Sequence, residues 1–374
     1  MGRQSRPAAS SAWTPPDTTP RRKTALAQVT RRRPILPDES FVALPEPAGL
    51  APYRRRLADV IGPDQAQAIS ETGVLRFHAV GDTGGHLDPR PQRRVVAAMV
   101  SELAGTVPAR FFYHLGDVVY PHGEEPNYSP QFFSAYADYT APIFAVPGNH
   151  DAESPAVSLG GFVKTFCSDV PPLRDAGVPV PRPLPRQPHV YWTLVHDWLR
   201  IIGMYSNVPE GGQFAGEQLQ WLTEELRASP TDATVVLAMH QPVYAAVVTH
   251  GSNLTLADAL DGCFAEARRV PDAVFTGHAH NYQRFARHLN DREIPYIVAG
   301  AGGYYERHAL ADGVSTLPAS FPGLDDVTLE AYEDQTHGFM TVTARPGGAE
   351  VVYTAVTRDS AAVVDCFRIG AGAT

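Results

Sequence analysis

Short apolar runs alternate with amphipathic and polar stretches along most of this chain. The runs VLRFHAV at 74–80, ARFFYHL at 109–115 and APIFAVP at 141–147 are rich in β-branched and aromatic residues, which is typical of buried strands. RPQRRVVAAMVSELA at 90–104 has the apolar spacing of a helix. This order of strand, polar loop, helix and strand predicts β-α-β units with parallel strands.

The second half of the chain continues the mixed pattern. We predict a hairpin over 189–206, helices over 217–228 and 254–269, and strands ending near His240, near His278 and before the glycines at 300–303. Three apolar or alternating segments close the chain and predict an antiparallel meander, at 338–344, 349–356 and 362–369. Residues 45–70 are expected to form one or two short helices. Irregular loops are expected over the Pro-rich segment 168–188 and over 304–336.

The chain has 374 residues, of which 44% are hydrophobic, which suits one large α/β domain with a tail. We place the catalytic domain at 46–374 and a leader rich in Pro and Arg at 1–45. The leader lacks the apolar core of an export signal, and the chain has no apolar run of 18 residues. A cytoplasmic protein without a membrane span is therefore expected.

Charge is unevenly distributed along the sequence. Eight basic side chains against one acidic side chain give residues 1–34 a net charge of +7, so the remainder of this chain of net charge −9 carries −16. A solvated disordered arm is the simpler interpretation of the leader. The alternative is an electrostatic tether to nucleic acid or an anionic membrane. Cys167, Cys263 and Cys366 have no zinc-binding spacing and predict free or structural thiols, with one disulfide as the alternative.

Five predicted strands end in side chains that can bind a metal ion. The donors are Asp82, Asp117, Tyr120, Asn149, His240, His278 and His280. The intervals of 35, 32 and 38 residues from 82 to 117, 117 to 149 and 240 to 278 each match one β-α-β unit, so strands of one sheet would bring the donors to one edge. Seven oxygen and nitrogen donors suit two metal ions that share a bridging carboxylate.

Each donor taken alone has a structural alternative. An Asp after a strand can cap a helix, a Tyr in a loop can pack, and a His at a strand end can be a hydrogen-bonded edge residue. His278-x-His280 is more specific, because alternate residues of an extended segment face the same side. The ordered combination favours a metal centre.

The motifs GDTG at 81–84, GDVVY at 116–120, GNHD at 148–151 and GHAH at 277–280 resemble the signature blocks of calcineurin-like metallophosphoesterases, and among them the purple acid phosphatases. The usual first block is Asp-x-His, whereas here Gly84 takes the third position, so one histidine ligand is absent. Tyr120 stands where purple acid phosphatases use a tyrosine phenolate as a ligand to ferric iron. The resemblance implies a four-layer α/β/β/α sandwich with two mixed sheets.

The same resemblance implies a ligand set. Asp82, Tyr120 and His280 would hold Fe(III). Asn149, His240 and His278 would hold a divalent ion, either iron, zinc or manganese, with Asp117 bridging the two ions.

The resemblance also implies a function, the hydrolysis of small phosphate monoesters by a metal-bound hydroxide, as in an acid phosphatase. His150 is the candidate for stabilising developing charge or protonating the leaving group, and Asp151 is the candidate for orienting His150. Two alternatives remain open at this point. One is a phosphodiesterase acting on nucleotides or lipid head groups, and the other is a metal-binding module without catalysis.

Overall fold

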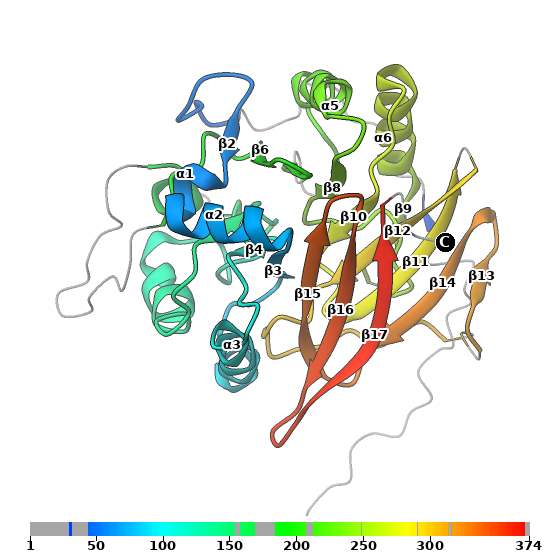
Figure 1. Cartoon of the computed structure of the whole chain (residues 1–374). Coiled ribbons are helices and arrows are strands. Elements are labelled where there is room, and N and C mark those ends of the chain that lie inside the picture. The colour runs from blue at the N-terminus through cyan, green and yellow to red at the C-terminus, as the bar shows by residue number, and fades with distance from the viewer. Residues whose placement is uncertain are drawn as a thin grey trace, which may run out of the picture.

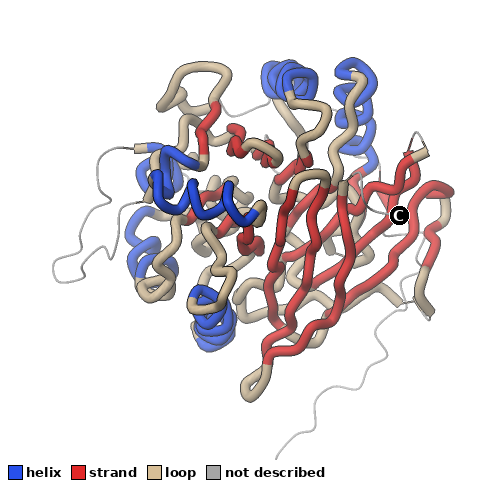
Figure 2. Tube along the Cα trace, in the orientation of Figure 1, coloured by secondary structure: helices blue, strands red, loops and turns tan. Residues whose placement is uncertain are grey.

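Two mixed β-sheets packed against each other form the centre of the molecule, and helices lie at the periphery (Figures 1 and 2). This computed structural model describes residues 30–31, 44–153, 158–168, 184–206, 212–247, 249–289, 291–312, 314 and 316–370. The predicted four-layer α/β/β/α class with two mixed sheets is confirmed.

The six-stranded sheet combines the first β-α-β units with the C-terminal meander. Its order is β17 (Ala361–Ile369), β16 (Gly348–Val356), β15 (His337–Arg345), β3 (Leu75–Val80), β4 (Phe112–His114) and β5 (Ile143–Ala145). β3, β4 and β5 are parallel, and β15 joins them by pairing antiparallel with β3. The predicted parallel units and the predicted meander therefore belong to a single sheet.

The nine-stranded sheet collects the middle of the chain. Its order is β13 (Ala319–Phe321), β14 (Leu324–Glu333), β11 (Tyr282–Leu289), β12 (Arg292–Ala299), β10 (Ala273–Thr276), β8 (Thr234–Ala238), β7 (Leu199–Gly203), β6 (Trp192–His196) and β2 (Arg54–Arg56). The predicted hairpin is β6–β7.

One sequence prediction about the second sheet is wrong. The segment 304–336 was expected to be irregular, yet it contains β13 and β14. In β14, the buried side chains Val327 and Leu329 alternate with polar ones. Acidic residues near the start of this strand obscure its short apolar pattern in the sequence.

The predicted helices form close to their expected bounds. α3 (Arg90–Leu103) packs on the six-stranded sheet, and α5 (Gly216–Ala228) packs against α6 (Leu254–Ala267) on the other side of the molecule (Figure 1). Among the described residues, the remaining α-helices are the shorter elements α1 (Ala58–Ile61), α2 (Pro63–Thr72) and α4 (Gly160–Phe162). Within the described part of the chain, no helix has the length and apolar character needed to cross a bilayer.

Two expected segments lie largely outside the described residues. Of the Pro-rich segment 168–188, only its ends are described. Of the leader, Thr30–Arg31 forms β1 and pairs in parallel with β9 (Ser252–Asn253), and residues 44 and 45 are described as well.

A core of interlocking side chains joins the two sheets. Leu75 and Phe77 from β3 meet Val236 from β8, Phe275 from β10 and Ile297 from β12 in one buried cluster. Each such side chain contributes about 1.5–3 kcal/mol through burial. This core fixes the relative position of the two sheets, and with it the loops that follow β3, β4, β5, β8 and β10.

Candidate metal centre

The predicted donors converge, but from two sheets rather than from one. Asp82, Asp117, Tyr120 and Asn149 follow strands of the six-stranded sheet, whereas His240, His278 and His280 follow strands of the nine-stranded sheet. The expectation of a single sheet is therefore wrong. Packing of the two sheets produces the same convergence, because the C-terminal ends of their parallel strands meet.

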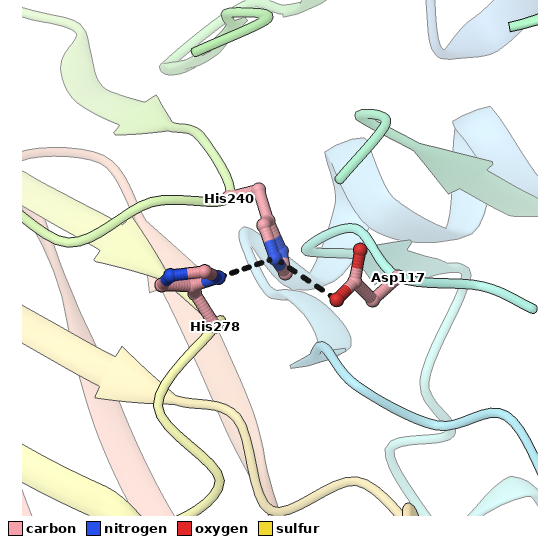
Figure 3. A group of neighbouring side chains, drawn as sticks. All are labelled: Asp117, His240 and His278. Carbon is pink, nitrogen blue, oxygen red and sulfur yellow. Dashed lines mark hydrogen bonds and ion pairs between the residues drawn. The ribbon is translucent and has the colours of Figure 1, made fainter. Parts of the chain in front are cut away.

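Asp117, His240 and His278 form the centre of the cluster. His240 lies between the other two, with Nε2 3.2 Å from Asp117 Oδ2 and 3.3 Å from His278 Nδ1 (Figure 3). One potential ligand atom from each of the three lies within 4.8 Å of the others. Asn149 adds its carbonyl oxygen, 3.1 Å from His240 Nε2 and 2.9 Å from His278 Nδ1.

Tyr120 connects this group to a second set of donors. Its hydroxyl donates to Asp82 Oδ1 at 3.4 Å and to Asp117 Oδ2 at 3.3 Å. His280 Nε2 lies 3.4 Å from Asp82 Oδ1. The structure thus brings all seven predicted donors into one cluster, with Asp117 touching both halves.

Local backbone conformation directs several of these side chains. Asp82, Asp117 and His278 have φ values of 57°, 54° and 68°, in the left-handed region that non-glycine residues rarely adopt. A network of backbone donors compensates for this strain. The His278 N–H donates to Asp82 Oδ2 at 2.8 Å, and the His150 N–H donates to Asp117 Oδ1 at 2.9 Å.

Gly84 leaves room for the Tyr120 ring, where a larger residue would not. A Cβ atom built at position 84 would lie 2.5 Å from Tyr120 Cδ2, which is closer than real Cβ contacts. The Tyr120 ring therefore occupies the space beside Gly84. Two hydrogen bonds with Gln131 hold the Tyr120 backbone, and the Tyr304 ring stacks on Tyr120 with centroids 4.1 Å apart.

The acidity of these groups is strongly perturbed. Burial raises the pKa of Tyr120 well above its ordinary value, and the Asp117 and Asp82 carboxylates raise it further. Burial lowers the pKa of His240, but the same two carboxylates outweigh that effect and bring the pKa to about 9. Without a cation, the cluster therefore holds protons that a metal ion would displace.

Asp151 does not orient His150, contrary to the sequence interpretation. Its carboxylate accepts hydrogen bonds from the backbone N–H groups of Gly148 and Val118, at 2.9 and 3.1 Å, and from the Tyr128 hydroxyl at 3.3 Å. The buried Asp151 side chain therefore links the loop after β4 to the loop after β5. Adjacency in sequence does not fix the direction of a side chain.

His150 instead faces Pro121 and Glu153. Its Nδ1 atom lies 2.6 Å from the Pro121 carbonyl oxygen and 3.3 Å from Glu153 Oε2. Burial lowers the pKa of His150, but the Glu153 hydrogen bond and the Asp117 charge outweigh it and raise the pKa to about 10. Sequence reasoning did not single out Glu153, because nothing in the motif marks it.

Two further histidines border the cluster. The ring of His250 lies 4.2 Å from that of His278, and the ring of His308 stacks on His280 at 4.2 Å, measured between centroids. His308 Nδ1 also accepts a hydrogen bond from the His280 N–H at 3.0 Å. His250 was missed in the sequence, where its only signal was a lone histidine in a loop.

This fold and this collection of donors are typical of metal-dependent phosphoesterases. The chain belongs to the calcineurin-like phosphoesterase family, whose model matches residues 75–282. Membership of this family implies a dinuclear metal centre.

Similar proteins include purple acid phosphatases and a cAMP/cGMP dual specificity phosphodiesterase of Mycobacterium tuberculosis, the latter 33% identical over 121 residues that cover 31% of this chain and 36% of that protein. Purple acid phosphatase 22 of Arabidopsis thaliana is 34% identical over 102 residues, which cover 25% of this chain and 23% of that protein. Tartrate-resistant acid phosphatase type 5 of Sus scrofa is 24% identical over 271 residues, covering 67% of this chain and 76% of the relative. The match thus spans less than a quarter of the length of the plant relative.

A solved structure supports the same fold. Purple acid phosphatase PPD1 from yellow lupin (Lupinus luteus) seeds superposes with a TM-score of 0.57 at 17% identity, over 79% of this chain and 54% of that chain. At this identity the similarity defines the fold alone.

Proposed function

We propose that this protein hydrolyses phosphate monoesters with a centre of Fe(III) and a divalent ion, as an acid phosphatase of the purple type. The observation that carries the proposal is the position of the Tyr120 hydroxyl between the Asp82 and Asp117 carboxylates, beside a glycine at position 84. A phenolate placed among carboxylates favours a trivalent iron over a divalent ion.

The contacts support a division of the ligands into two groups. Asp82, Tyr120 and His280 would hold Fe(III), because Asp82 touches both of the other two. The divalent ion, either iron, zinc or manganese, would be held by Asn149, His240 and His278, which touch one another. Asp117 contacts Tyr120 on one side and His240 on the other, as a bridging ligand requires.

When bound, the two ions would supply an activated water and neutralise charge that develops on the phosphate. Their combined charge exceeds that of the two carboxylates and the phenolate, so the site favours an anionic substrate. His150 would give a proton to the departing alcohol oxygen. Because the Pro121 carbonyl can only accept a hydrogen bond, the proton shared with it belongs to His150 Nδ1, and Nε2 is the nitrogen that remains for the substrate.

The decisive experiment compares a matched phosphomonoester and phosphodiester with metal-loaded protein from acidic to neutral pH, using Asn149→Ala as the blank. Faster cleavage of the monoester at acidic pH is expected. Faster cleavage of the diester would replace this proposal with a phosphodiesterase acting on nucleotides or lipid head groups. A metal-loaded protein that cleaves neither ester would instead be a metal-binding module.

The role of His150 has a separate test. His150→Ala is expected to lower turnover by about 10²–10⁴-fold, the usual contribution of general acid catalysis, while metal content stays at the parent level. Loss of both metals in this variant would make His150 a structural residue.

We further propose a cytoplasmic location and small phosphorylated metabolites as substrates. Cys167, Cys263 and Cys366 are all free thiols, which suits a reducing compartment. Cell fractionation of the full chain tests this location, and recovery of the protein in an exported fraction would contradict it.

A further inference from the structure

The structure assigns to Glu153 the role of a positioning residue that holds His150 and Asn149 in their working orientations. This inference rests on the proposed function, because it gives the orientation of His150 a catalytic purpose. Glu153 lies outside the GNHD motif and is partly buried at the edge of the metal-binding cluster.

The side-chain carboxylate of Glu153 contacts Asn149, His150 and His122. Glu153 Oε1 accepts a hydrogen bond from Asn149 Nδ2 at 3.3 Å. Its other oxygen, Oε2, lies 3.3 Å from His150 Nδ1 and 3.2 Å from His122 Nδ1. Glu153 therefore connects a proposed metal ligand, the proposed proton donor and an exposed histidine at the rim.

The contact between Glu153 and Asn149 fixes the orientation of the Asn149 side-chain amide. With Nδ2 turned toward Glu153, the carbonyl oxygen Oδ1 is turned toward His240 and His278, at 3.1 and 2.9 Å. An amide carbonyl is the atom of Asn that can bind a metal ion. Glu153 thus turns the carbonyl oxygen of Asn149, and not its amino group, toward the metal-binding cluster. Residues that hydrogen-bond to a metal ligand in this way commonly affect the properties of the metal site.

The contact between Glu153 and His150 fixes the orientation of the His150 ring. Glu153 Oε2 and the Pro121 carbonyl oxygen both face Nδ1, so this nitrogen carries a proton and the ring cannot flip without losing both partners. In the reaction, a water oxygen bonds to phosphorus and the ester P–O bond breaks, leaving its electron pair on the alcohol oxygen. His150 Nε2 then protonates that oxygen, and the proton is restored from the attacking water. Glu153 would keep Nε2 aimed at this position.

A neighbouring carboxylate provides a matched control. Glu124 lies on the same rim and accepts hydrogen bonds from the His122 N–H at 3.1 Å and from Asn127 Nδ2 at 3.0 Å. The Nδ1 atom of His150 contacts Pro121 and Glu153 instead. Glu124→Gln therefore removes one negative charge from the same rim without removing a partner of His150 or Asn149.

The kinetic test uses two phosphomonoesters whose leaving groups differ in basicity. 4-Nitrophenolate leaves without help from an acid, whereas the alkoxide of an alkyl phosphate needs a proton. Glu153→Gln keeps one acceptor oxygen for Asn149 but presents an amide N–H₂ to the histidine rings. We expect its kcat on the alkyl phosphate to fall by about 10- to 100-fold, as for other outer partners, with a much smaller change on 4-nitrophenyl phosphate and with KM and metal content unchanged.

Two comparisons make the kinetic result specific. Glu124→Gln should cleave both esters like the parent, and Glu153→Asp, which keeps the charge, should recover part of the activity on the alkyl phosphate. Equal slowing of both esters by Glu153→Gln, or the same loss in Glu124→Gln, would overturn the assignment.

A second readout does not depend on activity. In nitrogen NMR spectra of the zinc-loaded chain, with His150 assigned from its absence in His150→Ala, Glu153→Gln should shift the ring signals of His150 and His122 together. Glu124→Gln should leave His150 unchanged. If the parent cleaves no monoester, the proposed function fails while this readout still decides the role of Glu153; an unmoved His150 signal in Glu153→Gln overturns that role.

Discussion

Gly84 and the Tyr120 ring lie against each other beside Asp82, so the residue at one position limits the residue at the other. A side chain at position 84 and the Tyr120 ring cannot both occupy this space, because even a Cβ atom would lie 2.5 Å from Tyr120 Cδ2 and 2.9 Å from Gln131 Oε1. A glycine at position 84 and a tyrosine at position 120 therefore depend on each other.

This shared volume predicts the effect of a single methyl group. Gly84→Ala should lower the free energy of unfolding by about 1–3 kcal/mol through overpacking. Much of that loss should disappear when Tyr120→Ala is already present, because the clashing ring is gone. Urea unfolding of the four proteins measures this coupling. Gly262→Ala, in α6 where an added Cβ meets nothing within 4 Å, is the control and should not destabilise the protein.

Tyr120 also predicts a spectroscopic property. An iron-loaded protein should show a visible phenolate-to-iron charge-transfer band, and Tyr120→Phe should abolish it because the ligand oxygen is removed. Tyr304→Phe is the matched control, since Tyr304 stacks on Tyr120 while the hydroxyl facing Asp82 and Asp117 is that of Tyr120. A coloured Tyr120→Phe protein would contradict the proposed ligand set.

For single residues, the sequence predicted which side chains lie close together, but not always the direction in which each side chain points. The donors could be found because each follows a recognisable strand, and the ends of strands are placed by the fold. Glu153 and His250 could not be found in this way, since loop conformation decides their contacts. Asp151 was misjudged for the same reason, because its carboxylate turns toward backbone N–H groups.

Among the structural elements, the loops after β4 and β5 depend on one another through Asp151. This side chain is fully buried and accepts from Gly148, Val118 and Val119 N–H groups, the last at 3.4 Å. Asp151→Ala leaves these donors without that partner. We expect a loss of about 3 kcal/mol or more in the free energy of unfolding, because each buried unpaired donor costs about 1–3 kcal/mol.

Urea unfolding of the Asp151→Ala and His150→Ala variants compares the contributions of these two adjacent residues to stability. The His150 variant should unfold closer to the parent midpoint than the Asp151 variant, since the His150 side chain is partly exposed and the Asp151 side chain is fully buried. If Asp151→Ala were as stable as the parent and impaired only in turnover, Asp151 would act on catalysis and not on the loops.

The segment that leads into β6 carries a buried histidine far from the donors in sequence. His189 packs between Tyr53 and Tyr191, with ring centroids 4.9 and 4.2 Å away, and burial lowers its pKa to about 4. A histidine whose pKa is lowered by folding stabilises the protein above its unfolded pKa of about 6.5, and this contribution is lost as the pH falls toward 4.

His189→Phe should therefore gain stability relative to the parent on acidification. Between pH 7.5 and 4.5, the difference in unfolding free energy should move by about 2–3 kcal/mol in favour of the variant. Urea unfolding at the two pH values measures it. A difference that does not change with pH would show that folding leaves the pKa of His189 unshifted.

Element prediction succeeded where periodicity was long and unmixed. α3, α5 and α6 form close to the ranges expected, as do the strands of the meander. β11 and β14 were missed, because charged residues interrupt both. They are stabilised by pairing with each other, and β11 pairs with β12 and β14 with β13 as well. Such tertiary pairing overrides local propensity.

Over the whole molecule, the candidate metal centre lies where the two sheets meet. Asp82 of the six-stranded side contacts both the backbone of His278 and the ring of His280 from the nine-stranded side, and Asp117 contacts His240. Two bound metals would therefore cross-link the sheets. The sequence could not predict this bridging, because the spacing of motifs does not say which strands share a sheet.

This arrangement predicts that metal ions stabilise the packing of the sheets as well as the local loops. Removing the metals with a chelator should lower Tm and should increase hydrogen exchange at the ends of β3, β4, β8 and β10 together, because ligands that bind only the folded state stabilise it by mass action. Readdition of metal should restore both. Asp117→Asn from one sheet and His278→Ala from the other should each reduce the gain in Tm on loading. A gain in exchange confined to one sheet would show that the metals are held by that sheet alone.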